Sequence, residues 1–253
     1  MLKHKMLFLA GAALLATSAV TMAAAPTAKM KAAVADAGRP ADDTKRDENR
    51  KPAEMLAFAG VKPSMVVVDM LPGGGYFTRL FSDVVGPTGK VIAYVPDEMY
   101  AGRPKSLDGV TALAAEPTHG NIQPEHNPAL APGPANIVDV VWTSQNYHDL
   151  HNVAGLDVVA FNKVIYASMR PGGVYVVLDH SAPAGSGLTD TNTLHRIDEA
   201  TVRKEVEAAG FKFDGESKVL ANPADPRTNK VFDPSIRGHT DQFILRFRKP
   251  GGK

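Results

Sequence analysis

The sequence contains no cysteine and only one tryptophan among its 253 residues. The absence of cysteine excludes disulfide bonds, thiolate metal ligands and cysteine nucleophiles from any account of this protein. It leaves the cellular compartment open, because an exported protein can be stable without disulfides.

The sequence also lacks a clear excess of charge of either sign. It has 28 lysine and arginine residues against 27 aspartate and glutamate residues, and two of the lysines lie in the first 23 residues, which contain no acid. Without that segment the net charge is close to −1, so no basic surface field exists to attract nucleic acid or an anionic membrane. We expect a small-molecule partner and no nucleic-acid partner.

Long apolar runs are scarce, and the clearest one lies at the amino terminus. A basic start, residues 3–5, precedes the almost wholly apolar residues 6–19, with Thr21 and Ala23 at suitable −3 and −1 positions. This pattern is typical of a secretory signal peptide, and the run is short for a membrane span. We predict a signal peptide over residues 1–23 and an exported protein, periplasmic in a Gram-negative source, without stable membrane insertion after cleavage. The sequence leaves the oligomeric state open.

Residues 24–45 are rich in alanine, proline, aspartate and lysine, a composition typical of a linker or flexible arm. From residue 46 to residue 253 the chain is long enough for one α/β domain with a sizeable core. The sequence therefore predicts a signal peptide, an arm and a single folded domain.

The stretch that organises this domain is MVVVDMLPGGGYFTRLFSDVV, residues 65–85. An apolar run leads to Asp69, three glycines follow at 73–75, and apolar residues then recur at helical spacing through residues 77–85. This pattern predicts a buried strand, a glycine turn and a helix that packs by one face.

The turn has the features of a nucleoside-type site. Gly73, Gly74 and Gly75 let a ligand approach the backbone closely, and the helix from Tyr76 would point free N–H groups at the same place. Asp69 could accept hydrogen bonds from hydroxyl or amino groups. The alternative is a tight strand-to-helix turn with no ligand, since short glycine motifs give many false positives.

Strand and helix patterns alternate along the rest of the chain. Further strands are expected at residues 90–95, 110–113, 137–142, 174–178, 211–213 and 243–247, and further helices near residues 52–59, 158–169 and 195–210. The sequence therefore predicts an α/β fold with a mainly parallel sheet, helices on both faces and a late antiparallel strand at one edge.

Polar residues follow several expected strands, where open α/β sheets place their ligands. Asp97 follows the second strand and is a candidate for holding a ribose, and Asn146 and His148 follow the strand at 137–142. Asp179 and His180 close the strand at 174–178. His148 and His151 with Asp149 have only a generic metal-ligand spacing, so we expect no metal site.

Arg46 and Arg50 lie four residues apart, on one side of any helix that includes both. They could reach an anionic ligand, or they could be solvated or paired with Asp47 and Glu48. The sequence does not choose between these arrangements.

Five segments give the chain a resemblance to the class I S-adenosylmethionine-dependent methyltransferase family, and more narrowly to a group of exported bacterial predicted methyltransferases. They are VVDMLPGGGYFT (67–78), SQNYHDL (144–150), MRPGGVYVVLDHSA (169–182), LHRIDEATVRKEVEAAGF (194–211) and VFDPSIRGHTDQFILRFRKP (231–250). The resemblance covers residues 46–249.

This resemblance implies a Rossmann-like, doubly wound sheet of seven strands, with the seventh antiparallel between the fifth and the sixth. It implies S-adenosylmethionine as cofactor, with Asp69, Gly73 and Gly75 around its methionine and ribose parts. The residues themselves add Gly74, Asp97 and Asn146 as candidate cofactor-binding residues. Two positions depart from the family pattern: Leu71 stands where a glycine is usual, and Val95 where a ribose-binding acid is usual.

The catalytic candidates are His148 or His180 as a base, with Asp179 orienting the base. A methyltransferase would align the acceptor with the sulfonium methyl group for direct displacement. S-adenosylmethionine is made in the cytosol, so two alternatives stay open for an exported protein. One is a non-catalytic protein that binds a nucleoside-type ligand, and the other is a hydrolase or lyase that uses His148, Asp179 and His180.

Overall fold

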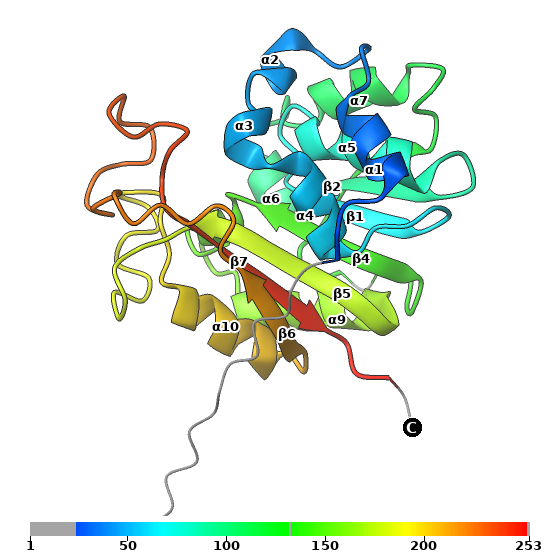
Figure 1. Ribbon diagram of the computed structural model, residues 1–253. Helices are drawn as coiled ribbons and strands as arrows, with labels where there is room; N and C mark the ends of the chain where they lie inside the picture. Colours follow the sequence, from blue (N-terminus) through cyan, green and yellow to red (C-terminus); the bar gives the residue numbers. More distant parts are fainter. Residues whose placement is uncertain (1–23, 132, 252–253) are drawn as a thin grey trace, which may run out of the picture.

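The computed structural model describes residues 24–131 and 133–251 (Figure 1), so the predicted signal peptide, residues 1–23, lies outside the described residues. Among the described residues, no helix combines the length and the apolar character that crossing a membrane requires.

Seven strands form one sheet. They are β1 (Val66–Met70), β2 (Lys90–Pro96), β3 (Ile122–Asn127), β4 (Val138–Ser144), β5 (Met169–His180), β6 (Lys212–Ser217) and β7 (Gln242–Arg248). The strand order is β3-β2-β1-β4-β5-β7-β6, and β7 runs antiparallel to both β5 and β6 while the other neighbours are parallel. The predicted α/β class and the antiparallel strand between the fifth and sixth strands are confirmed. The expectation that the antiparallel strand lies at an edge of the sheet is wrong, since β6 is the edge strand and β7 lies inside it.

Ten helices accompany these strands in the described residues. They are α1 (Ala28–Val34), α2 (Ala41–Thr44), α3 (Asp47–Arg50), α4 (Pro52–Ala59), α5 (Tyr76–Val85), α6 (Asp97–Tyr100), α7 (Asp108–Ala114), α8 (Tyr147–Leu150), α9 (Val158–Ser168) and α10 (Glu199–Ala208). Helices α1, α4, α5 and α7 cover one face of the sheet, and α9 and α10 cover the other (Figure 1).

Each face of the sheet has its own apolar core, because alternate side chains of the strands point in opposite directions. On one face Phe77 and Phe81 of α5 pack against Trp142 of β4, with ring centroids 4.8 and 5.8 Å from the indole. On the other face Phe161 of α9 and Phe211 join the buried side chain of Tyr175. The two cores hold the carboxyl ends of β1, β4 and β5 in fixed positions.

The expectation of a flexible arm over residues 24–45 is wrong for the helical part of that segment. The Thr27 side chain accepts a hydrogen bond from the backbone N–H of Met30, which caps the start of α1. Met30 and Ala33 are buried in the same core as α5. Composition pointed to a linker, but two apolar residues on one helical face were enough to attach α1 to the domain.

The third strand was also misplaced. Val110 and Leu113, expected in a strand, lie on α7 and pack against the glycine turn, and the strand is β3. Their spacing of three residues fits one face of a helix. β3 escaped notice because Pro124 interrupts a polar segment, which is tolerated here since β3 is an edge strand.

Candidate functional site

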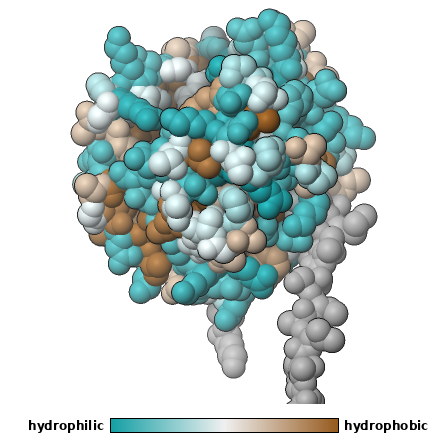
Figure 2. All heavy atoms as spheres, turned by 90° about the vertical axis from the view of Figure 1, so that its left-hand side faces the viewer, coloured by the Kyte–Doolittle hydropathy of each residue, from teal (hydrophilic) through white to brown (hydrophobic). Residues whose placement is uncertain are grey.

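A cavity of about 550 Å³ opens at the carboxyl ends of β1, β4 and β5. This size lies within the range of small-molecule sites in proteins. The left-hand side of Figure 1, where the polar segment 222–241 lies, faces the viewer in Figure 2, and its surface is mainly hydrophilic. The cavity lies at the carboxyl ends of parallel strands, which is where open α/β sheets generally bind their ligands.

The glycine turn forms one wall of the cavity. Gly73 and Gly74 line it, and Gly73 has the left-handed φ of 57° that favours glycine. Gly75, also left-handed with φ 88°, faces away, since a Cβ there would lie 3.2 Å from Val110 and 3.3 Å from Leu113. Gly73 and Gly74 are therefore placed to contact a ligand, whereas Gly75 is required for the packing of α7.

Leu71 keeps the backbone shape that a glycine would have at its position. Its φ is 57°, its side chain lines the cavity, and its carbonyl accepts a hydrogen bond of 3.0 Å from Asn146 Nδ2. Two other non-glycine residues that line the cavity, Gln145 and His195, also have positive φ angles, 63° and 57°. Strain of this kind costs on the order of 1–3 kcal/mol per residue and gathers at functional sites.

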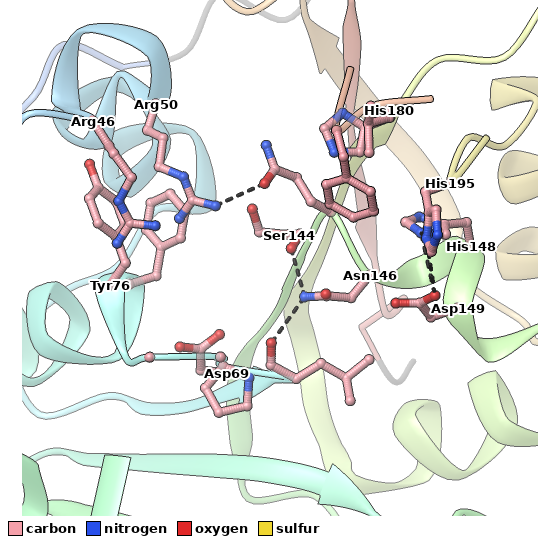
Figure 3. A pocket seen from close by; sticks show the side chains of 18 of the residues that line it. Arg46, Arg50, Asp69, Tyr76, Ser144, Asn146, His148, Asp149, His180 and His195 are labelled. Carbon is pink, nitrogen blue, oxygen red and sulfur yellow. Dashed lines mark hydrogen bonds and ion pairs between the residues drawn. The ribbon is translucent and has the colours of Figure 1, made fainter. Parts of the chain in front are cut away.

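Asp69 lies at the floor of the cavity, at the carboxyl end of β1 (Figure 3). Its carboxylate accepts a hydrogen bond of 2.6 Å from the hydroxyl of Thr78 on α5. Burial raises the pKa of Asp69 to about 7, although the Thr78 hydroxyl and the nearby Arg50 charge oppose the shift. A cationic group bound in the cavity would favour the ionised form.

Arg50 and Arg46 approach the cavity from the side opposite the histidines, next to Tyr76 (Figure 3). The guanidinium of Arg50 lies 4.7 Å from the Tyr76 ring centroid and donates a hydrogen bond of 2.9 Å to the neutral amide of Gln145. Arg46 forms an ion pair with Asp43 and also stacks over Tyr76. The structure thus places Arg50 to reach an anionic ligand, while Arg46 is largely engaged by its own helical neighbour.

Asn146 lies between these two sides of the cavity (Figure 3). Its Nδ2 donates to the carbonyl oxygens of Leu71 and Ser144, which ties the end of β1 to the end of β4.

Asp97, by contrast, does not line the cavity, since its carboxylate pairs with His126 at 2.6 Å and the side chain is 41% exposed. The assignment of Asp97 to a ribose therefore does not agree with this arrangement, because α6 begins at Asp97 and turns the side chain toward β3.

A smaller cavity of about 290 Å³ adjoins the first one, and the two share six lining residues: Leu71, Gly73, Gly74, Arg103, Asn146 and Asp149. Its far wall contains Val95 and Met99. Val95, found where an acid is usual in the resembled family, thus gives this part of the site an apolar wall suited to a flat ring.

His148 and Asp179 form a buried pair on the side of the larger cavity that faces Arg50. Asp179 accepts hydrogen bonds from the His148 backbone N–H at 2.8 Å and interacts with its Nδ1 at 2.9 Å. Burial alone would lower the pKa of His148, but the Asp179 carboxylate holds it above its ordinary value. His148 lines the cavity, whereas Asp179 is fully buried behind it, so Asp179 can only orient the imidazole.

His180 lines the cavity beside this pair, and its Nδ1 lies 2.7 Å from the hydroxyl of Thr240 on the segment before β7. Burial lowers the pKa of His180 to about 4. The imidazole is therefore neutral near pH 7, where it can orient a ligand by a hydrogen bond.

Two further residues at the cavity, His195 and Phe232, were missed as site residues from the sequence, and Asp149 was weighed only as a metal partner of His148 and His151. His195 approaches His148 to 3.3 Å, Asp149 lies beside both, and Phe232 packs its ring 4.9 Å from the His195 ring. The only sequence signal for His195 and Phe232 was their presence in segments that carry the family resemblance. His151, weighed as a metal partner of His148, instead pairs with Glu205 of α10.

Known proteins with similar sequences share one activity in their names. The chain is 30% identical over 195 residues to the ubiquinone/menaquinone biosynthesis C-methyltransferase UbiE of Ectopseudomonas mendocina, covering 76% of this chain and 65% of that protein. It is 33% identical over 196 residues to the UbiE protein of Shewanella pealeana, covering 76% of this chain and 66% of that protein.

The chain is thus a sequence relative of C-methyltransferases, and it shares its fold with S-adenosylmethionine-dependent methyltransferases.

Solved structures agree at the level of the fold. A S-adenosylmethionine-dependent methyltransferase from Aquifex aeolicus matches with a TM-score of 0.56 at 17% identity, over 83% of this chain and all of that one. The [4+2]-cyclase SpnF matches with a TM-score of 0.58 at 16% identity, over 86% of each chain. The arsenic(III) S-adenosylmethionine methyltransferase CrArsM from Chlamydomonas reinhardtii matches with 0.57 at 16% identity, over 89% of this chain and 74% of that one.

The chain spans 65–66% of the length of the two UbiE relatives, slightly less than two thirds. No protein-family model matches it. The cyclase among the neighbours shows that the fold also carries other chemistry, so the activity is argued from the site.

Proposed function

We propose that the protein is an S-adenosylmethionine-dependent methyltransferase that acts on a small-molecule acceptor. The observation that carries this proposal is the joining of two cavities across the glycine turn, one with Asp69 and Arg50 and the other with an apolar wall. Such a site complements a ligand that carries an amino group, a carboxylate and a flat base.

The charges that line the site favour one orientation of the cofactor. Its amino group would lie against Asp69 and its carboxylate against Arg50, since each pairs opposite charges. Its adenine would occupy the smaller cavity between Val95 and Leu71. The methyl group would then point toward Asn146 and the histidine side of the larger cavity, which stays free for the acceptor.

The chemistry in this arrangement is a direct displacement. The acceptor atom forms a bond to the methyl carbon while the sulfur–carbon bond breaks, which leaves S-adenosylhomocysteine. Most of the rate enhancement would come from alignment of acceptor and methyl group. Asp179 fixes the orientation of His148, and Thr240 that of His180. Both imidazoles can therefore position an acceptor, and His148, whose pKa is raised, is the one suited to receive its proton.

Calorimetric titration of the purified protein with S-adenosylmethionine and S-adenosylhomocysteine tests this function. We expect both to bind with micromolar affinity, and the Asp69→Ala variant to bind S-adenosylmethionine more weakly by about 1–3 kcal/mol, the cost of a lost charged hydrogen bond. Asp97→Ala is the matched control, because Asp97 is half-exposed, pairs with His126 and does not line either cavity. Folded wild-type protein that binds neither compound at millimolar concentration would refute the proposal.

We also propose that the protein is exported, on the basis of its amino-terminal sequence. Cleavage after Ala23 would leave α1 and its Thr27 cap complete. Mass spectrometry of the protein recovered from cells is expected to show a mature start near Ala24. A protein that retains Met1 would contradict export by a cleaved signal.

A further inference from the structure

Three potential metal ligands converge at the histidine side of the cavity. His148 Nε2 lies 3.3 Å from His195 Nδ1 and 3.5 Å from Asp149 Oδ1, and His195 Nδ1 lies 3.8 Å from the same carboxylate oxygen. Figure 3 shows the three side chains directed toward one another at the cavity wall. Two imidazole nitrogens and one carboxylate oxygen thus form a nearly equilateral triangle.

The size of this triangle matches the coordination shell of a transition-metal ion. Nitrogen and oxygen ligands lie about 2.1 Å from Zn²⁺, so two ligands of a tetrahedral site are about 3.4 Å apart. The three observed separations, 3.3, 3.5 and 3.8 Å, lie close to that value. An ion could therefore be bound with little movement of the side chains.

The surroundings of His148 also fit a metal ligand. Its Nδ1 faces the fully buried Asp179 carboxylate at 2.9 Å, which fixes the proton on Nδ1 and leaves the Nε2 lone pair directed at Asp149 and His195. A carboxylate behind a histidine in this way is the usual second partner of metal-bound histidines. The Asp179 carboxylate also accepts a hydrogen bond of 2.8 Å from the backbone N–H of His148, which fixes the carboxylate beside the imidazole.

His195 is held in place by features outside the triangle. Its backbone adopts a φ of 57°, a left-handed conformation that is uncommon for a non-glycine residue, and its ring packs edge-on against Phe232. The next residue, Arg196, is fully buried and paired with Asp225. The loop thus holds His195 in a strained conformation that directs Nδ1 toward His148.

We propose that His148, Asp149 and His195 form a binding site for one divalent transition-metal ion such as Zn²⁺ or Fe²⁺. Two histidines and one carboxylate are a ligand set that such ions use, with the remaining coordination positions open to a substrate or water. Those positions face the cavity here, since all three residues line it. If the proposed methyltransferase function holds, the open positions lie where an acceptor with an oxygen or nitrogen donor would bind.

Metal binding is tested on purified protein treated with a chelator and shown to be folded by circular dichroism. Titration with Zn²⁺ against a chromophoric chelator is expected to show one site, and Co²⁺ to give the visible absorption of a protein-bound ion with nitrogen and oxygen ligands. His195→Ala is expected to weaken Zn²⁺ binding more than about 100-fold, and Asp179→Asn by about 10–100-fold because it removes the orienting carboxylate. His239→Ala, a substitution of an exposed histidine, is the matched control and should leave the affinity unchanged.

Two outcomes would overturn the inference. One is the absence of a one-to-one complex with either ion in folded wild-type protein, which would mean that the triangle is only an N–H···N hydrogen bond and an ion pair. The other is equal affinity in wild type and His195→Ala, which would move the metal elsewhere. Titration of wild type and His195→Ala with S-adenosylmethionine separates this result from the proposed function, because His195 lines only the larger cavity and Asp69 and Arg50, which would bind the cofactor, are not metal ligands.

Discussion

Replacing Arg196 by methionine is expected to lower the free energy of unfolding by about 3–5 kcal/mol, because it leaves a buried carboxylate without its partner. Arg196 and Asp225 are both fully buried at their side chains and form a two-point ion pair at 2.9 and 3.2 Å. Since single domains are stable by about 5–15 kcal/mol, this loss would remove a large part of the total.

The buried pair has a structural task. Arg196 also donates to the carbonyl oxygens of Ser181 and Asn229, and Asp225 accepts the backbone N–H groups of Arg227 and Asp241. Burial of Asp225 would raise its pKa, but these N–H groups and the guanidinium hold the pKa below its usual value. Together they attach the polar segment 222–241, which carries Phe232, to the loop that carries His195.

Urea unfolding measures the effect. Arg203→Met is the matched control, since Arg203 and Glu207 form an exposed pair at 3.6 Å and Arg203 stacks over Phe213, so the loss should be about 1 kcal/mol or less. Asp225→Asn added to Arg196→Met should recover part of the stability, because it removes the unpaired charge. A single Arg196→Met variant as stable as wild type would show that the pair does not attach the segment.

Replacing Asp69 by asparagine is expected to stabilise the protein without ligand above pH 7 and to have little effect at pH 4. The folded pKa of Asp69, about 7, lies about three units above that of an unfolded aspartate, and one unit corresponds to about 1.4 kcal/mol. A raised folded pKa contributes stability that is complete below the unfolded pKa and is lost as the pH rises through the folded pKa. Wild type therefore loses up to about 4 kcal/mol of this contribution between pH 4 and pH 7, and the variant does not.

Denaturant unfolding of wild type and Asp69→Asn at pH 4, 5.5, 7 and 8 tests this difference. Asparagine can still accept the Thr78 hydrogen bond, so the comparison isolates the charge. Two parallel stability curves would show that the Asp69 carboxylate has an ordinary pKa and would contradict the prediction.

The same pKa links cofactor binding to pH. If the amino group of S-adenosylmethionine pairs with Asp69, binding favours the carboxylate and releases a proton near neutral pH. We expect the wild-type affinity to rise between pH 6 and pH 8 and to lose this dependence in Asp69→Asn. Calorimetry in two buffers of different ionisation enthalpy counts the released protons, and an equal heat in both buffers would contradict the pairing.

Local sequence patterns predicted most of the fold. The apolar run before Asp69, the glycines and the spaced apolar residues of α5 identify a strand, a turn and a helix within one continuous stretch, and β2, β4, β5 and β7 were placed in the same way. Periodicity works here because each element buries its own regular face. It failed at β3, where Pro124 and polar residues conceal an edge strand, and at α1, where the burial of Met30 depends on a distant helix.

The sequence by itself determined the α/β class, the family resemblance and the position of the turn with Asp69 and Gly73 at the cavity. Only the tertiary structure brought His195 to His148 and Arg50 to Gln145, and it directed Asp97 toward His126. The physical reason is that strand, turn and helix signals act between near neighbours in the chain. His148 and His195 are separated by 47 positions in the chain, and Arg50 and Gln145 by 95. Contacts over such separations depend on how the sheet orders its strands and where its loops are attached.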